Sequence, residues 1–175
     1  VITGKDFILD INIELNNDTY INLEMQVVNK HNWPDRSLSY LCRNYDNLYQ
    51  GQDYEEARPV YHIGFLDFTL FPEHKEFYAS YMLLNVKSHY AFSSKFVLSV
   101  VQLNQTNLAT EEDKAYGIDH WARLFKAKTW EEIKMLAKDN ESMQEAVNSI
   151  YMANADEMVR QKCLAREEAE RHERT

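Results

Sequence analysis

The chain has 175 residues, of which 45% are hydrophobic and 13% aromatic, and it carries a formal net charge of −9 at pH 7. These values predict a globular domain with a substantial core and exclude a disordered chain, and no apolar run approaches the roughly 20 residues of a bilayer span. The acidic balance disfavours nucleic-acid binding through general charge alone, because phosphate contacts need clustered Lys and Arg, but a metal site or a local basic strip can act in an acidic chain.

The first 29 residues predict a β-hairpin. In DFILDINIEL and YINLEMQVVN, apolar side chains occupy the odd positions, and the NNDT between them contains residues that tolerate left-handed backbone. Burying both apolar sets on one face requires odd residues to pair with odd, as in Leu9 with Met25. A three-residue loop over 16–18 delivers this register.

The same register brings polar side chains together on the other face. Asp10 is predicted to lie opposite or diagonal to Glu24 and Gln26, and carboxylates so close repel each other unless a cation lies between them. Because Mg²⁺ prefers carboxylate and carbonyl oxygens, this D–x13–E–x–Q pattern predicts a divalent-metal site. The alternative is an ordinary solvent-facing polar strand face. The helix that follows must pack near this face, which favours the metal site.

An amphipathic helix is predicted over 33–51, with Pro34 near its start and Gly51 at its end. Its predicted apolar face comprises Leu38, Leu41, Cys42, Tyr45, Leu48 and Tyr49. A neighbouring stripe at three- and four-residue steps comprises Arg36, Tyr40 and Arg43.

Three strands and a helical region follow. PVYHIGFLDFTLF, at 59–71, is apolar on both faces and predicts a buried central strand, while FYASYMLLNV and KFVLSVVQL predict two more. From about residue 110, GIDHWARLFKA, TWEEIKMLAKD and SMQEAVNSIYMA show helical spacing, and the charged RQKCLAREEAERHERT is typical of a solvated helix. We therefore predict an α/β fold with a mixed central sheet, made of a core over 1–109 and a helical extension over 110–175 packed on the same domain.

The cysteines and histidines favour no zinc site. Cys42 and Cys163 lie far apart and are predicted to be reduced thiols of a cytoplasmic protein. None of the six histidines has a spacing typical of zinc ligands, and His62, in the apolar strand, is predicted to be a core residue.

Several segments together resemble a known family. They are GKDFILDINIELNNDTYINLEMQVVN, the R-x3-Y at 36–40, YQGQDYEEARPVYHIGFLDFTLF and the late WARLF. In order and spacing they resemble the Rpn family of recombination-promoting nucleases and transposases, in the PD-(D/E)XK superfamily, over nearly the whole chain. The resemblance implies a restriction-endonuclease-like fold and Mg²⁺-dependent cleavage of DNA, with Mn²⁺ as a substitute and no organic cofactor. Members also have a helical segment before the hairpin, which we expect this chain to lack.

The resemblance also assigns roles to the hairpin residues. Asp10 matches the family's Asp, Glu24 the acid of its E-x-Q, and Gln26 the position that is Lys in most of the superfamily. It implies that Asp10, Glu24 and the backbone carbonyl of Met25 hold the metal. Gln26, which cannot take a proton as an amine could, is expected to orient the attacking water.

Three further residues are candidates for contacts with DNA phosphates. Arg36 and Tyr40 match the family's arginine and tyrosine on the helix after the hairpin, and Lys5 matches a family lysine. Each has an alternative interpretation. Arg36 could pair with a nearby acid, Tyr40 could be a boundary residue with a satisfied hydroxyl, and Lys5 could be a charge at a strand edge.

The predicted function is a metal-dependent DNA endonuclease. The first alternative is a catalytically inactive member of the fold that binds nucleic acid or a protein, and the second is an interaction module without a metal. The melting temperature distinguishes the nuclease prediction from these alternatives. If the nuclease prediction is right, Mg²⁺ or Mn²⁺ should raise the melting temperature, and Asp10→Asn should abolish that rise. Because cutting both strands often needs two active sites, a homodimer formed through the C-terminal helices is compatible with the nuclease prediction.

Overall fold

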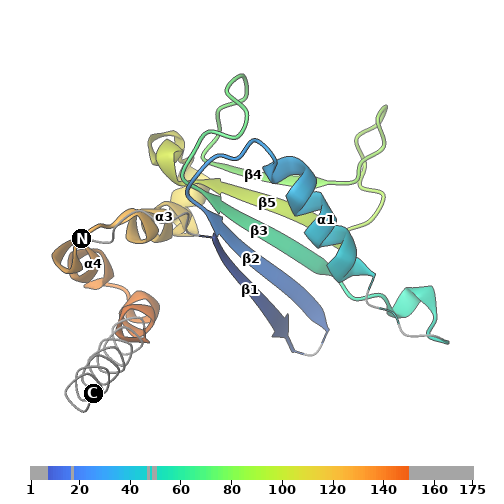
Figure 1. The fold of residues 1–175 in the computed structure, drawn as a ribbon, viewed down its shortest axis with the longest axis horizontal. Helices are drawn as coiled ribbons and strands as arrows, with labels where there is room; N and C mark the ends of the chain where they lie inside the picture. Colours follow the sequence, from blue (N-terminus) through green and yellow to red (C-terminus); the bar gives the residue numbers. More distant parts are fainter. Residues whose placement is uncertain (1–7, 17, 47, 49–50, 150–175) are drawn as a thin grey trace, which may run out of the picture. The chain divides into compact units, whose positions relative to one another are not determined.

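A mixed β-sheet lies at the centre of the computed structural model, which describes residues 8–16, 18–46, 48 and 51–149 (Figure 1). Its strand order is β1-β2-β3-β5-β4. The outer pairs β1–β2 and β4–β5 are antiparallel, and the inner pairs β2–β3 and β3–β5 are parallel. The strands are β1 Ile8–Leu15, β2 Thr19–Gln26, β3 Val60–Leu66, β4 Tyr78–Met82 and β5 Phe96–Gln102. The predicted α/β fold with a mixed central sheet is confirmed.

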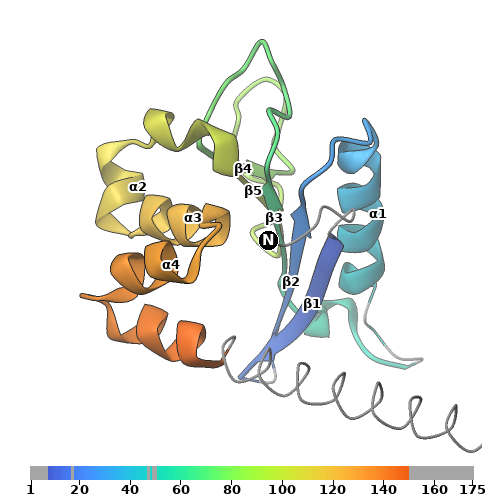
Figure 2. The ribbon, with the colours of Figure 1, turned by 60° about the vertical axis from the view of Figure 1, so that its left-hand side comes forward.

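Helices lie on both faces of this sheet, with α1 on one face and α2 and α3 on the other (Figure 2). The α-helices are α1 Trp33–Tyr45, α2 Glu111–Ala115, α3 Ile118–Lys126 and α4 Trp130–Ala137. Short 3-10 helices span Tyr54–Glu56 and Leu103–Leu108, and residues 141–149 are also helical. The chain forms two compact units, Val1–Lys126 and Ala127–Thr175, so α2 and α3 belong to the unit that contains the sheet.

The hairpin has the predicted register. Leu9 pairs with Met25, and Asp10 pairs with Glu24. The loop between Leu15 and Thr19 has the predicted length, and Asn16 adopts a φ of 52°, in the left-handed region that asparagine tolerates. Parity and loop length were therefore sufficient to place the two acids opposite each other along the backbone.

The burial of the two hairpin faces differs from the prediction. In β2 the polar residues Asn22, Glu24 and Gln26 are buried, whereas the intervening apolar side chains are only half-buried. The exposed apolar side chains of β1 include Ile11, Ile13 and Leu15. The reason is that α1 packs across β3 and β5 on the polar face and covers it, while β1 lies at the edge of the sheet.

Helix α1 also differs in its length and its buried face. It begins at Trp33 with Pro34 in its first turn, as predicted, but it ends at Tyr45 and not near Gly51. Its buried residues are Trp33, Ser37 and Leu41, while Leu38 and Cys42 of the predicted apolar face are exposed.

The packing of α1 on the sheet depends on a close approach between Trp33 and Gly64. A Cβ placed on Gly64 would lie 2.1 Å from Trp33 Cζ2, so the indole ring lies directly on the backbone of β3. Trp33 joins a core cluster with Leu66, Phe68 and Val100. Because Gly64 has no side chain, α1 can approach closely to the strands that carry Glu24 and its neighbours.

The opposite face of the sheet has its own core cluster. It comprises Phe77, Val101, Leu103 and Ala122, with Phe65 packed against it. The ring of Phe65 meets that of Phe125 edge to face, with 4.9 Å between centroids, which fixes α3 on this face.

Some predictions fall on residues that the structure does not describe. Lys5, Cys163 and the charged segment over 160–175 lie outside the described residues. Cys42 is a free thiol. Among the helices that the structure does describe, none has the length and apolarity that crossing a membrane requires.

We predict that Gly64→Ala lowers the free energy of unfolding by about 1–3 kcal/mol, because the new methyl group forces the Trp33 indole off β3. Chemical denaturation measures this change when it is followed by far-ultraviolet circular dichroism, which reports on the backbone and not on the tryptophan ring. In a Trp33→Leu background the same substitution should cost markedly less, because the clashing ring is gone. Equal costs in both backgrounds would contradict the packing described here.

Candidate active site

The carboxylate of Glu24 is the centre of a buried polar cluster beneath α1. Glu24 is 1% exposed, and its Oε1 lies 3.1 Å from Arg36 Nε. Its Oε2 lies 3.7 Å from Nε2 of His62, whose side chain is also fully buried. A carboxylate removed from water needs opposing charge or hydrogen bonds to remain ionised, and the guanidinium supplies the charge here.

The first turns of α1 place Arg36 over this carboxylate. Tyr40 follows one turn later, and its ring lies 5.4 Å from Arg36 Cζ and 5.8 Å from Arg43 Cζ. One half-buried phenol ring therefore contacts two guanidinium groups, and each contact is attractive because the ring face is electronegative. The predicted stripe of Arg36, Tyr40 and Arg43 exists, and Arg36 pairs with an acid, which was the alternative interpretation of this residue.

His62 is a site residue that sequence reasoning did not identify. Its predicted burial is confirmed, but its contact with Glu24 was not anticipated. The imidazole ring lies 5.9 Å from that of Trp33 and 6.3 Å from that of Tyr40. The available signal was a polar residue within an apolar strand that pairs in parallel with β2, where Asn22 is the register partner of His62.

Gln26, on the same buried face of β2 as Glu24, has a buried acceptor atom. Its Nε2 donates a hydrogen bond of 2.7 Å to the Val28 carbonyl oxygen. Because a carbonyl oxygen can only accept, this bond identifies the amide nitrogen and leaves Oε1 as the free end of the side chain. Within the described part of the chain, Oε1 is buried and accepts no hydrogen bond. An unsatisfied buried acceptor fits a water molecule or a cation.

The remaining predicted metal ligands are located only through the backbone. Asp10 is directly opposite Glu24 in the β1–β2 register, but the position of its side chain is outside what the structure describes. Met25 lies between Glu24 and Gln26 and directs its half-buried side chain to the other face of the sheet. The use of its carbonyl oxygen as a ligand stays a prediction.

The donor atoms of this cluster fit a hard divalent cation. Glu24 offers carboxylate oxygens, Gln26 an amide oxygen, and the backbone of Asp10 lies directly across from Glu24. Oxygen donors of this kind suit hard cations such as Mg²⁺ or Mn²⁺. Among the side chains that the structure describes, no group of three or more His, Cys, Asp or Glu could hold a metal.

Comparison with known proteins identifies the family. Residues 1–175, the entire chain, match the family model described as PD-(D/E)XK nuclease family transposase. No curated protein and no solved structure gives a significant match. The resemblance inferred from the hairpin, the helix and the later strands is thereby confirmed at the level of the family.

We predict strong energetic coupling between Glu24 and Arg36 in the absence of metal. A double-mutant cycle with Glu24→Gln and Arg36→Gln should give a coupling of about 1–3 kcal/mol, discounted from a fully buried pair because the Arg36 side chain is 24% exposed. Urea denaturation of the four proteins measures it. The exposed pair of Glu111 and Lys114 is the control and should couple far more weakly. Similar coupling in both pairs would show that Glu24 is not stabilised by Arg36.

Proposed function

The chain belongs to the PD-(D/E)XK nuclease family of transposases, and we propose that it is a metal-dependent endonuclease that hydrolyses phosphodiester bonds in DNA. The observation that supports this proposal most strongly is the buried carboxylate of Glu24, directly across the hairpin from Asp10 in the strand register. Two residues later, Oε1 of Gln26 is also buried, and it accepts no hydrogen bond among the described residues. A buried acceptor without a hydrogen bond opposes stability, which supports a functional role for this face of β2.

Asp10, Glu24 and the carbonyl oxygen of Met25 would hold the cation, with Mg²⁺ as the expected ion and Mn²⁺ as a substitute. The cation supplies positive charge to the phosphate and lowers the pKa of a water molecule. Because the amino group of the usual superfamily Lys is replaced by the amide of Gln26, this chain has less positive charge of its own at the site. Arg36 would therefore have to supply more of the positive charge that stabilises the phosphate.

Gln26 is suited to orienting the attacking water. Its amide nitrogen is held by the Val28 carbonyl oxygen, so Oε1 can accept a hydrogen bond from the water and aim the lone pair of the water oxygen at phosphorus. An amide cannot remove the proton, so Gln26 acts in positioning and not as a general base.

Arg36 would exchange partners during the reaction. In this structure its Nε is 3.1 Å from Glu24 Oε1, and a cation held by the same carboxylate would compete with it. The Arg36 side chain is partly exposed, so its planar fork can turn toward the oxygens of the phosphate. Tyr40, whose ring lies 5.4 Å from the guanidinium, supports Arg36 in both positions.

The alternative function is a catalytically inactive member of the fold that binds nucleic acid or a protein. One observation favours it: Arg36 already balances the charge of Glu24 in this structure. If that alternative holds, Arg36 is a permanent structural partner, and added divalent cations have no effect on DNA.

The proposal also covers the extent of the catalytic core, the cellular compartment and the oligomeric state. We assign the catalytic core to residues 1–109 and the role of recombination or transposition to the whole protein, acting in the cytoplasm, where the exposed thiol of Cys42 would stay reduced. A homodimer would provide the two sites that cleavage of both strands requires.

We predict that the wild-type protein nicks supercoiled plasmid DNA in the presence of Mg²⁺ and that Glu24→Gln lowers the rate at least about 100-fold, because this change removes a ligand charge at the reacting centre. Gel electrophoresis of the plasmid over time measures both rates. Glu111→Gln, which makes the same charge change at a 92% exposed side chain on α2, is the control and should match wild type. Equal nicking by wild type and Glu24→Gln would show that the assigned residue is not catalytic.

A further inference from the structure

A surface groove adjoins the Glu24 cluster, between the hairpin and the last turns of α1. It has a volume of about 250 Å³. The residues that line it are Asn12, Ile13, Tyr20, Ile21, Arg43 and Asn44. Nothing in the assigned chemistry uses this groove.

The groove lies directly beside the proposed reacting centre. Asn22, two residues before Glu24 on the same face of β2, donates a hydrogen bond of 2.9 Å to Oδ1 of Asn12, which lines the groove. Two residues of a strand span about 7 Å, and the seven residues from Arg36 to Arg43 span about 10 Å along a helix. A DNA strand with one phosphate at the proposed metal site beside Glu24 would therefore place a neighbouring nucleotide near the groove.

Among the residues that the structure describes, the guanidinium group of Arg43 in the groove is not paired with an acid. Arg36 is paired with Glu24, and Arg58, at the far end of the hairpin, is paired with Glu14. Arg43 differs from both, because within the described residues its guanidinium group forms no ion pair and no hydrogen bond, and its contact is the ring of Tyr40 at 5.8 Å. In a chain with a net charge of −9, an arginine beside the site that pairs with no acid in the described ranges is available to bind an anion.

We propose that this groove binds a DNA backbone phosphate adjacent to the one that is cleaved, with Arg43 as the residue that holds it. This inference rests on the proposed nuclease function and adds a second phosphate position to it. The planar fork of arginine fits two phosphate oxygens, and the contact with Tyr40 limits the rotation of the guanidinium before the ligand arrives.

The other residues of the groove suit the rest of a nucleotide. The Oδ1 of Asn12 is occupied by Asn22, so its Nδ2 is the atom that can donate to a phosphate or sugar oxygen. None of these contacts reads a base edge, so the groove should contribute affinity and register without sequence preference.

The salt dependence of DNA binding tests this assignment. Binding of a fluorescent duplex is measured by anisotropy in Ca²⁺, to allow binding without cleavage, at several salt concentrations for the full chain. Arg43→Gln should raise Kd about fivefold to tenfold at 0.1 M salt and reduce the magnitude of the slope of log K against log salt by about 0.9, the value for one lost phosphate contact. Arg43→Lys should keep the slope.

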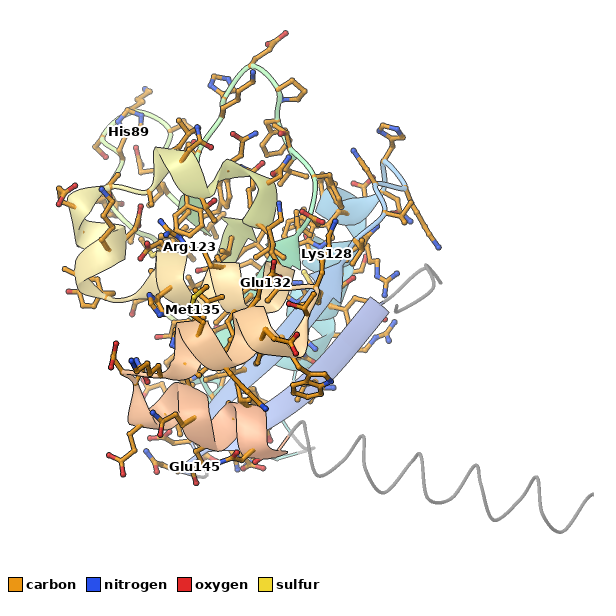
Figure 3. The ribbon with its side chains drawn as sticks, turned by 90° about the vertical axis from the view of Figure 1, so that its left-hand side faces the viewer. His89, Arg123, Lys128, Glu132, Met135 and Glu145 are labelled. Atoms are coloured by element: carbon orange, nitrogen blue, oxygen red, sulfur yellow. The ribbon has the colours of Figure 1, made fainter. Side chains whose placement is uncertain are left out.

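Arg123→Gln is the matched control, because it removes the same charge from α3, on the opposite face of the sheet (Figure 3). Arg123 is exposed and pairs with Asp119 at 3.4 Å, so its loss should leave Kd and slope near the wild-type values. Thermal melting of each variant shows whether it is folded.

The outcomes separate this inference from the proposed function. If wild type binds and nicks DNA but Arg43→Gln has the same slope as Arg123→Gln, the groove assignment is wrong and the nuclease proposal stands. An increase in Kd without a change in slope also overturns it, since no phosphate contact was then lost. If wild type neither binds nor nicks DNA, the proposed function fails and the groove assignment fails with it.

Discussion

The burial of the Glu24 carboxylate under α1 determines how the helix and the sheet fit together. Glu24 lies in the middle of β2, on the face that the helix covers, and two of its partners come from other elements: Arg36 from α1 and His62 from β3. The close approach of Trp33 to Gly64 brings α1 near enough for Arg36 to reach the carboxylate. Packing and charge therefore determine the same geometry, because the helix cannot dock in this position without placing its arginine over the acid.

The sequence predicted the alignment of the two acids well and the environment of the site only in part. Alternation with a period of two, together with the length of the loop at 16–18, is sufficient to pair Asp10 with Glu24. The same alternation does not show which face a later helix covers. The apolar side of β1 consequently was predicted to be buried and is exposed, while the polar side of β2 lies beneath α1. Local patterns describe a strand, but long-range packing decides which of its faces is buried.

Residues far apart in the sequence explain the other differences. His62 contacts Glu24 only because β3 runs parallel to β2, and a lone histidine in an apolar strand contains no information about that neighbour. The buried face of α1 follows Trp33, Ser37 and Leu41 because Gly64 accepts the indole ring, whereas helical spacing alone favoured a stripe through Leu38. Arg36, Tyr40 and Arg43 were correctly placed on one stripe, but only the structure distinguishes the arginine that is paired from the one that is not.

Arg36 and a divalent cation would compete for the carboxylate of Glu24, and Mn²⁺ binding followed by electron paramagnetic resonance measures that competition. We expect one tight Mn²⁺ per chain in the wild type, loss of that site in Glu24→Gln, and tighter binding in Arg36→Gln, because the competing positive charge is removed. Mn²⁺ binding of equal affinity in wild type and Glu24→Gln would show that the buried carboxylate is not part of a metal site.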